Sequence, residues 1–309
     1  MRDNDELIAF TELGSEIDLR FYGVAFVLRP DGSTARELGN PKRAVNLRSI
    51  LKLVRGSLLC ERLSIKASDV LPEHAVLVGS HDGLEIHRDA VAGLARLLQV
   101  DASDARCPLG PPQNPLEALR LSLDGSGPDL LRHQCLGEHL GVLRMCRDFG
   151  GSYDYASLNH EVHTAVFDLV NSLGMVASVP VLDRCGMPTL VLPAIGIART
   201  LSRLLAEDRS GFMTIQNAIA AYPQHYAGPG RFSTKLSEYS GGRVLAKESA
   251  SGGFIAWNRN LGDVILAFCS SGEHAASESA MIALMRAEGW IGSDFGESTC
   301  GGQLVRSVL

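Results

Sequence analysis

Segments with strand character lie near both ends of the chain, and the long stretch between them has helical periodicity. A β-branched and aromatic run over residues 21–28 meets a turn signal at 29–33, which predicts a hairpin with residues 35–38. Three later runs have strand character and are separated by turns that contain glycine or asparagine: 243–247, 254–257 and 264–269. A helix is predicted around Ser49, and the other segments predicted to be helical are 85–98, 116–123, 129–148, 158–173, 194–206, 212–222 and 273–288.

This order of segments predicts an α+β fold in which the N- and C-terminal strands form one antiparallel sheet. The closing helix would lie across that sheet, and the middle of the chain would form a helical lobe beside it. We therefore expect residues 1–309 to form a single catalytic unit, with a sheet region at 1–45 and 232–309 and a mainly helical region at 46–231. The cleft between the sheet and the helical lobe is a natural place for a site.

The charge and cysteine content of the chain exclude some classes of function. A net charge of −6 gives no electrostatic basis for binding nucleic acid, so a small-molecule partner is expected. No apolar run is long enough to cross a bilayer, and the acidic N-terminal residues lack the features of a signal peptide. The seven cysteines are odd in number and include no Cys-x-x-Cys pair, which is typical of a reduced, cytoplasmic protein.

A serine and a lysine, Ser49 and Lys52, lie three residues apart in an apolar segment. Residues at i and i+3 share one helix face, and an unprotonated lysine beside a serine hydroxyl makes that hydroxyl nucleophilic. Such a pair is usually a solvated helix face without chemistry. This chain has only five lysines, however, and no other lysine has a serine three residues before it.

Two more residues could join this pair. Ser80 sits in a turn at or near a helix start, and Lys247 ends a predicted edge strand that would border the same cleft. Two lysines that converge on one site lower each other's pKa, so one of them becomes usable as a base near neutral pH. Taken alone, Lys247 is better explained as a solvated strand end.

Several segments, in order from about residue 21 to 270, resemble the thermolabile, rhizobial-type (class 3) L-asparaginases. Leu38-Gly-Asn-Pro with Arg48-Ser49-x-x-Lys52 looks like the nucleophile segment of that family, and Ser80-His81, with His87 six residues further on, like its second serine motif. Cys135-Leu-Gly-Glu-His139 is similar to its Cys-Ser-Gly-Lys-His motif, and Asp183-Arg-Cys185-Gly-Met-Pro-Thr189 to its Asp-Gly-Cys-x-x-Pro-Thr. The most literal match is Pro223-x-x-x-Ala-Gly-x-Gly-Arg231-x-x-Thr234.

The resemblance implies the fold of serine β-lactamases and bacterial glutaminases, and amide hydrolysis through two serine–lysine pairs. Ser49 would be the nucleophile and Lys52 its base, while Ser80 and Lys247 would relay protons or position the amide. The residues expected to bind the substrate are Arg48, His81, Glu138, His139 and Asp183. The resemblance also implies a homodimer and a zinc ion, for which the residues at matching positions are Cys135, Cys185, Glu138 and Asp183.

Three departures from the family pattern bear on the substrate. Glu138 stands where the family has lysine, His133-Gln134 replaces Ser-Asn, and residues 13–20 lack the family's Arg-Gly/Ser-Gly-x-x-Glu segment. An added carboxylate should disfavour the α-carboxylate of free asparagine, or else strengthen a zinc site. We therefore expect an asparaginase-like amidohydrolase with an altered carboxamide or acyl substrate.

Four alternatives remain open: a true L-asparaginase, an acyl-transfer or cyclising enzyme of specialised metabolism, a non-catalytic binding member of the fold, and a penicillin-recognising hydrolase or peptidase. The last is disfavoured because the Ala-Gly-x-Gly-Arg and Asp-x-Cys motifs point elsewhere.

Overall fold

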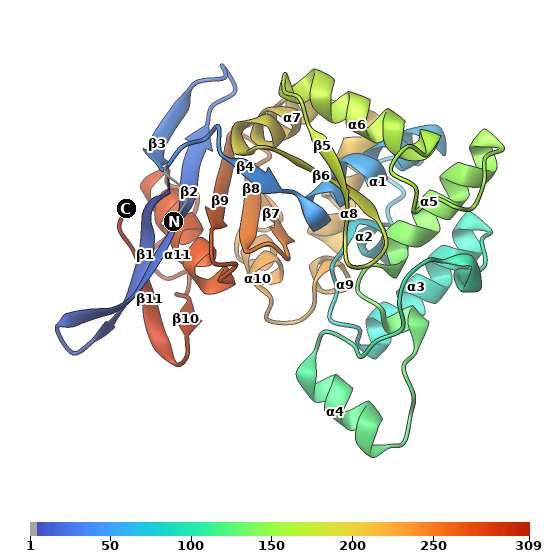
Figure 1. The fold of residues 1–309 in the computed structure, drawn as a ribbon, viewed down its shortest axis with the longest axis horizontal. Coiled ribbons are helices and arrows are strands. Elements are labelled where there is room, and N and C mark those ends of the chain that lie inside the picture. Colours follow the sequence, from blue (N-terminus) through green and yellow to red (C-terminus); the bar gives the residue numbers. More distant parts are fainter. Residues whose placement is uncertain (1–4) are drawn as a thin grey trace.

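Strands from both ends of the chain form one antiparallel sheet, as predicted (Figure 1). In the computed structural model, which describes residues 5–309, the strands lie in the order β10-β11-β1-β2-β9-β8-β7, and β3 pairs with β2 beside this path. They are β1 (Glu6–Leu13), β2 (Glu16–Leu28), β3 (Thr34–Leu38), β7 (Val244–Ser249), β8 (Gly253–Asn258), β9 (Val264–Cys269), β10 (Thr299–Cys300) and β11 (Gln303–Ser307).

The central strands of this sheet are buried on both faces. Along β2, Val24 and Phe26 pack into the core shared with the helical region, while Ala25 and Val27 pack into a second core beneath the closing helix α11 (His274–Ala287). Successive side chains of a strand point to opposite faces, so burial on both faces requires a continuous apolar run. The predicted runs at 21–28, 254–257 and 264–269 therefore form the sheet centre, and β7 lies at the sheet edge as expected.

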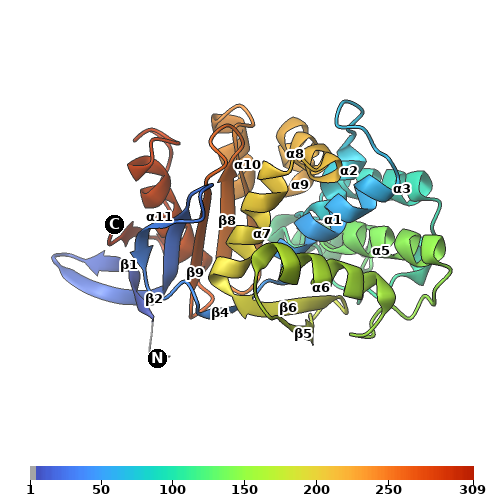
Figure 2. The ribbon, with the colours of Figure 1, turned by 90° about the horizontal axis from the view of Figure 1, so that it is seen from above.

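The middle of the chain is mainly helical and lies beside the sheet (Figure 2). Its helices are α1 (Leu51–Arg62), α2 (Pro72–Val78), α3 (Glu85–Leu98), α4 (Pro115–Leu123), α5 (Leu136–Phe149), α6 (Glu161–Gly174), α7 (Ala194–Ala206), α8 (Ser210–Ala221) and α9 (Pro223–Tyr226), followed by α10 (Phe232–Tyr239). The single helix predicted over residues 129–148 is divided: a 3₁₀ turn at Leu130–Arg132 is followed by α5, because the backbone of His133 is extended. No helix among residues 5–309 is long and apolar enough to cross a membrane.

A second sheet was not predicted. It has three short strands in the order β4-β6-β5, with bounds β4 (Ala44–Asn46), β6 (Pro188–Pro193) and β5 (Val179–Leu182). Prolines within these short segments weaken their strand signal. This sheet fixes the chain immediately before Ser49, since the amide of Leu47 donates to the carbonyl of Leu190.

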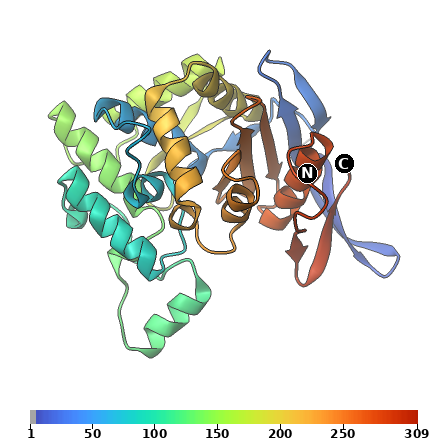
Figure 3. The same cartoon turned by 180° about the vertical axis from the view of Figure 1, so that it is seen from behind.

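The two ends of the chain contribute strands that the sequence pattern missed. The β1–β2 hairpin projects from the body of the molecule (Figure 3). Residues 16–20, at the start of β2, are exposed and polar in part, so they form a strand only because they pair with β1. The last twenty residues contain β10 and β11, and β11 pairs with β1.

Candidate active site

Three separate elements bring Ser49, Ser80 and Lys247 to one place. Ser49 lies in a 3₁₀ turn at Arg48–Ile50 that leads directly into α1, Ser80 lies in the loop between α2 and α3, and Lys247 lies on β7. The backbone amide of Ser80 donates to the carbonyl of Tyr226 at 3.1 Å. The preceding residue is Gly79, and a Cβ there would overlap the same carbonyl, so only glycine allows this close approach.

The Ser80 hydroxyl oxygen contacts two buried lysine nitrogens. Lys247 Nζ donates to Ser80 Oγ at 2.8 Å, and Lys52 Nζ lies 3.4 Å from the same oxygen. Lys52 Nζ also donates to the carbonyl of Gly79 at 2.7 Å. Ser49 Oγ makes no hydrogen bond with any residue in the 5–309 range, so Ser49 and Lys52 are not hydrogen-bonded to each other. Instead, both lysines converge on the second serine.

The two lysines have opposite pKa shifts. Burial lowers the pKa of Lys247 to about 7, and the neighbouring Lys52 ammonium contributes to that lowering. Burial would also lower the pKa of Lys52, but the Cys135 thiol, Glu138 and Cys185 raise it above its ordinary value. Lys52 is therefore the fixed cation of the pair, and Lys247 is the one that can be neutral near pH 7.

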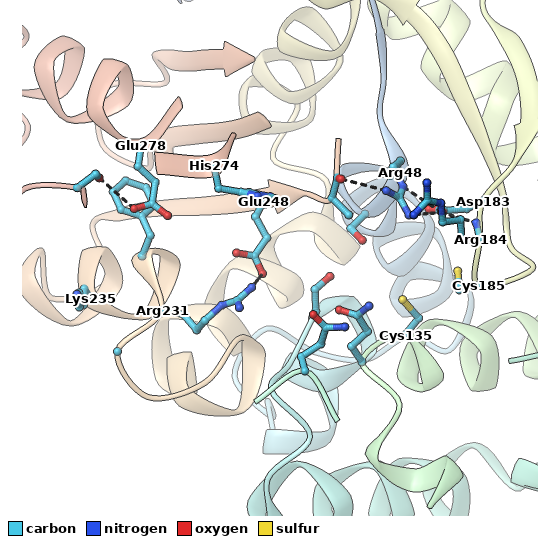
Figure 4. Close-up of a pocket in the computed structure, with 18 of the residues that line it drawn as sticks. Arg48, Cys135, Asp183, Arg184, Cys185, Arg231, Lys235, Glu248, His274 and Glu278 are labelled. Carbon is cyan, nitrogen blue, oxygen red and sulfur yellow. Dashed lines mark hydrogen bonds and ion pairs between the residues drawn. The ribbon is translucent and has the colours of Figure 1, made fainter. Parts of the chain in front are cut away.

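A pocket of about 810 Å³ opens on both serines (Figure 4). Six of the predicted site residues line it: Arg48, Ser49, Ser80, Cys135, Asp183 and Cys185. Five do not, and lie behind its wall: Lys52, His81, Glu138, His139 and Lys247. The two histidines have no exposed surface, and burial lowers the pKa of both, so they are neutral packing groups around the site.

Arg48 and Asp183, which were predicted to bind substrate, bind each other. Arg48 Nη2 and Nε donate to Asp183 Oδ1 at 2.7 and 3.0 Å, and Arg48 Nη1 donates to the carbonyl of Ala250 at 3.0 Å. Most of the hydrogen-bonding capacity of this guanidinium is therefore used within the protein.

Glu138, which stands where the family has lysine, is buried and forms an ion pair. Its carboxylate forms an ion pair with Arg55, and its other oxygen lies 3.9 Å from Lys52 Nζ. Arg55 is also buried and donates to the carbonyl of Pro188 at 2.8 Å. A buried carboxylate requires such partners, because an unpaired one is costly to bury. Glu138 therefore acts on the site through Lys52.

The Cys135 and Cys185 side chains lie next to each other on the pocket wall (Figure 4). This contact lowers the pKa of Cys135, and Lys52 lowers it further. Zinc sites in proteins use three or four protein ligands, yet no group of three or more His, Cys, Asp or Glu side chains in residues 5–309 is arranged to hold a metal. The zinc site therefore remains a prediction.

Three residues that were not singled out as site residues also line the pocket: Arg231, Glu248 and Glu278. Arg231 Nη2 donates to Glu248 Oε1 at 2.5 Å, and Arg231 Nη1 lies 3.5 Å from Asp82 Oδ1. Glu278, on α11, points into the pocket from the far side (Figure 4). Arg231 belongs to the Gly-x-Gly-Arg motif, and Glu248 follows Lys247, so both could have been noticed. Glu278 has no local sequence signal.

Comparisons with known proteins agree with the resemblance stated above. No curated protein matches the sequence significantly. Among solved structures, a putative β-lactamase from Bacteroides dorei is 14% identical over 85% of this chain and 93% of its own, with a TM-score of 0.45. A β-lactamase from Sphaerobacter thermophilus is 16% identical over 87% and 91%, with a TM-score of 0.40. A Bacillus subtilis glutaminase in covalent complex with 5-oxo-L-norleucine is 13% identical over 91% and 92%, with a TM-score of 0.37. The family model described as L-asparaginase II matches residues 14–300, so the chain belongs to the L-asparaginase II family.

Proposed function

We propose that this chain hydrolyses a carboxamide through an acyl-enzyme on Ser49, with Ser80 and Lys247 moving the proton. Family membership supports an enzyme that hydrolyses amide bonds and takes a small-molecule substrate. The single observation that carries the proposed serine–lysine chemistry is the contact of Ser80 Oγ with Lys247 at 2.8 Å and Lys52 at 3.4 Å. Both serines line one pocket, so an amide bound there is within reach of either hydroxyl.

The lysine roles in this proposal differ from those that the resemblance implies. Lys52 has a raised pKa and stays protonated, so it suits a fixed cation and not a base. Lys247 has a pKa of about 7, near the value that is most effective for general base catalysis at neutral pH. We therefore propose Lys247 as the base and Ser80 as the hydroxyl that links it to Ser49.

In the proposed reaction, each bond that forms is matched by a bond that breaks. Ser49 Oγ attacks the carboxamide carbon while its proton passes through Ser80 to the neutral Lys247 amine. The C–N bond breaks when the nitrogen takes that proton back and leaves as ammonia. Water then cleaves the ester, which releases the carboxylate and restores the Ser49 hydroxyl. Ser49 lies in the 3₁₀ turn that leads into α1, and the positive end of the α1 dipole favours an oxyanion there.

We also propose that the preferred substrate is not free L-asparagine. Arg48, the cation next to Ser49 in the chain, already binds Asp183, so only Arg184 remains there for an α-carboxylate, and free asparagine has few other groups with which to bind. Ammonia release should then be faster from some other carboxamide than from free L-asparagine. Purified protein that deaminates free L-asparagine at least as fast as every other amide would show that it is a true L-asparaginase.

Acylation by p-nitrophenyl acetate tests the chemistry without knowledge of the substrate. We expect one acetyl group per chain in the intact mass, located on Ser49 by peptide mapping and absent in Ser49→Ala. Ser80→Ala should still be labelled on Ser49, but more slowly. Label on Ser80 alone would reverse the roles of the two serines, and no label from several esters and β-lactams would favour a binding protein without catalysis.

A further inference from the structure

The pocket continues well beyond the two serines. It runs from Ser49 and Ser80 across the start of α10 to α11 and the segment before β10 (Figure 4). Its volume of about 810 Å³ is in the range of sites that bury a drug-sized ligand. Free asparagine is far smaller than such a ligand. The space therefore suits an amide that carries a second group.

The part of the pocket away from the serines has its own character, and we call it the far compartment. Its apolar wall consists of Phe232, Ile282 and Phe295, each less than 8% exposed. Phe232 and Phe295 pack edge to face, with ring centroids 6.0 Å apart. Rigid aromatic walls of this kind bind apolar side chains.

The two parts of the pocket differ in charge. Near Ser49, two arginines face one carboxylate: Arg48, Arg184 and Asp183. In and beside the far compartment, three carboxylates face two cations: Glu248, Glu278, Glu297, Arg231 and Lys235. A ligand that spans the pocket is therefore favoured if it is negative near Ser49 and positive at the far end.

Glu278 is the acid of the far compartment that has no cation of its own. Glu248 is satisfied by Arg231 at 2.5 Å, whereas Glu278 forms no ion pair with any residue of the described part of the chain. Glu278 Oε2 accepts one hydrogen bond, from Ser298 Oγ at 3.1 Å. Burial raises the pKa of Glu278, as expected for a carboxylate whose charge is not fully compensated. An ammonium group would supply the missing charge.

We infer that the far compartment binds the free α-amino group and apolar side chain of a residue that precedes a C-terminal asparagine. The substrate class is thus a short peptide of two or three residues, and this inference rests on the proposed function. The carboxamide of the last residue lies at Ser49, and its α-carboxylate faces Arg184. The apolar side chain packs against Phe232 and Phe295, and the ammonium group binds Glu278. Each residue added before the asparagine extends the peptide by at most about 3.6 Å, so the number of residues decides how far the ligand reaches from Ser49.

Ammonia release from a graded series tests this assignment. The series is L-asparagine, leucyl-asparagine, leucyl-leucyl-asparagine and the N-acetyl form of each peptide. We expect kcat/KM to be at least about tenfold higher for one free peptide than for L-asparagine. We expect acetylation of that peptide to lower kcat/KM by about tenfold, because the ammonium charge is lost, which corresponds to about 1.4 kcal/mol.

Glu278→Gln should remove most of the preference for the free peptide over its acetyl form. A merely structural role of Glu278 would change both forms equally and leave their ratio intact. Glu207→Gln, which neutralises an exposed carboxylate outside the pocket, is the matched control and should keep the wild-type ratio. Peptides that react no faster than L-asparagine, or a ratio that Glu278→Gln leaves unchanged, would overturn the inference while the proposed hydrolase stands.

The wild-type protein could fail to cleave every amide of the series. In that case, calorimetric measurement of peptide binding to Ser49→Ala tests the inference separately from the proposed function. Binding of the free peptide that weakens about tenfold in Ser49→Ala/Glu278→Gln would support the far compartment and refute the hydrolase. Absence of binding together with absence of cleavage would overturn both.

Discussion

Replacement of Lys247 by arginine distinguishes two roles for this residue, that of a base and that of a fixed cation. Arginine keeps a positive charge and a hydrogen bond to Ser80, but it cannot give up its proton in a protein. A lysine with a pKa of 10.5 is neutral in only about 3 of 10⁴ molecules at pH 7, whereas a pKa of about 7 makes half of them neutral. Burial thus raises the population of free base by about 10³-fold, and Lys247→Arg forfeits that population entirely.

We expect Lys247→Arg to lower the acylation rate of Ser49 by about 10²–10⁴-fold, the range for loss of a general base. Lys52→Arg is the matched control, because Lys52 is held as a cation, and it should lose less than about tenfold. The wild-type rate should rise with pH through about 7 and then level off, since the free amine forms above the pKa of Lys247. Burst kinetics with p-nitrophenyl acetate between pH 5 and 9 give both quantities.

The opposite ranking would refute this assignment. A Lys52→Arg variant that loses more activity than Lys247→Arg would make Lys52 the base, as the family resemblance implies. A rate that is independent of pH between 5 and 9 would exclude either lysine as a titrating base near pH 7. Thermal unfolding of both variants should be measured, because arginine is larger than lysine and both sites are buried.

Lys52→Met should raise the pKa of Lys247 by about 0.5–2 units in the acylation profile, because the two nitrogens are at most about 6.2 Å apart and repel each other. The folded-state pKa of Lys247 lies below its unfolded value, so the unfolded chain binds more protons between about pH 7 and 10. The free energy of unfolding in urea should therefore rise with pH across this window, by up to about 5 kcal/mol. This rise should vanish in Lys247→Met. Glu138→Gln should destabilise the fold by about 3–5 kcal/mol, since Arg55 is left unpaired, and replacement of both by leucine should restore much of the loss in the same assay. Zinc, if bound, depends on Cys135, so elemental analysis of Cys135→Ser should find less zinc than in the wild type.

The parts of the fold that could be predicted are those whose burial leaves a mark in the sequence. Strands β7, β8 and β9 are buried along their whole length, and each contains a short apolar run. The β4-β6-β5 sheet and strand β11 escape this reasoning, because they are short and partly exposed and owe their structure to pairing partners distant in the chain. Strand propensity depends on such context more than helix propensity does.

The candidate site shows the same limit. Ser49 and Lys52 attract attention through local spacing, yet the closest lysine–serine contact is between Lys247 and Ser80, which are 167 positions apart. Their expected positions beside the cleft, and then motif resemblance, pointed to Ser80 and Lys247, but neither could say which lysine is neutral. That depends on burial and on the Cys135 and Glu138 groups around Lys52, which only the packed structure defines.

Glutamate stands at position 138, where the family has lysine, and its side chain lies at a different place from the one that the sequence suggested. The added carboxylate was expected to face the substrate, but Glu138 is buried behind the pocket and binds Arg55 and Lys52. Cys135 and, after it, Glu138 raise the pKa of Lys52, and a protonated Lys52 adds to burial in lowering the pKa of Lys247. The exchange therefore acts first on which lysine can be the base. A change in substrate preference has to come from residues that touch the pocket space, and among these Glu278 is the carboxylate still without a cation.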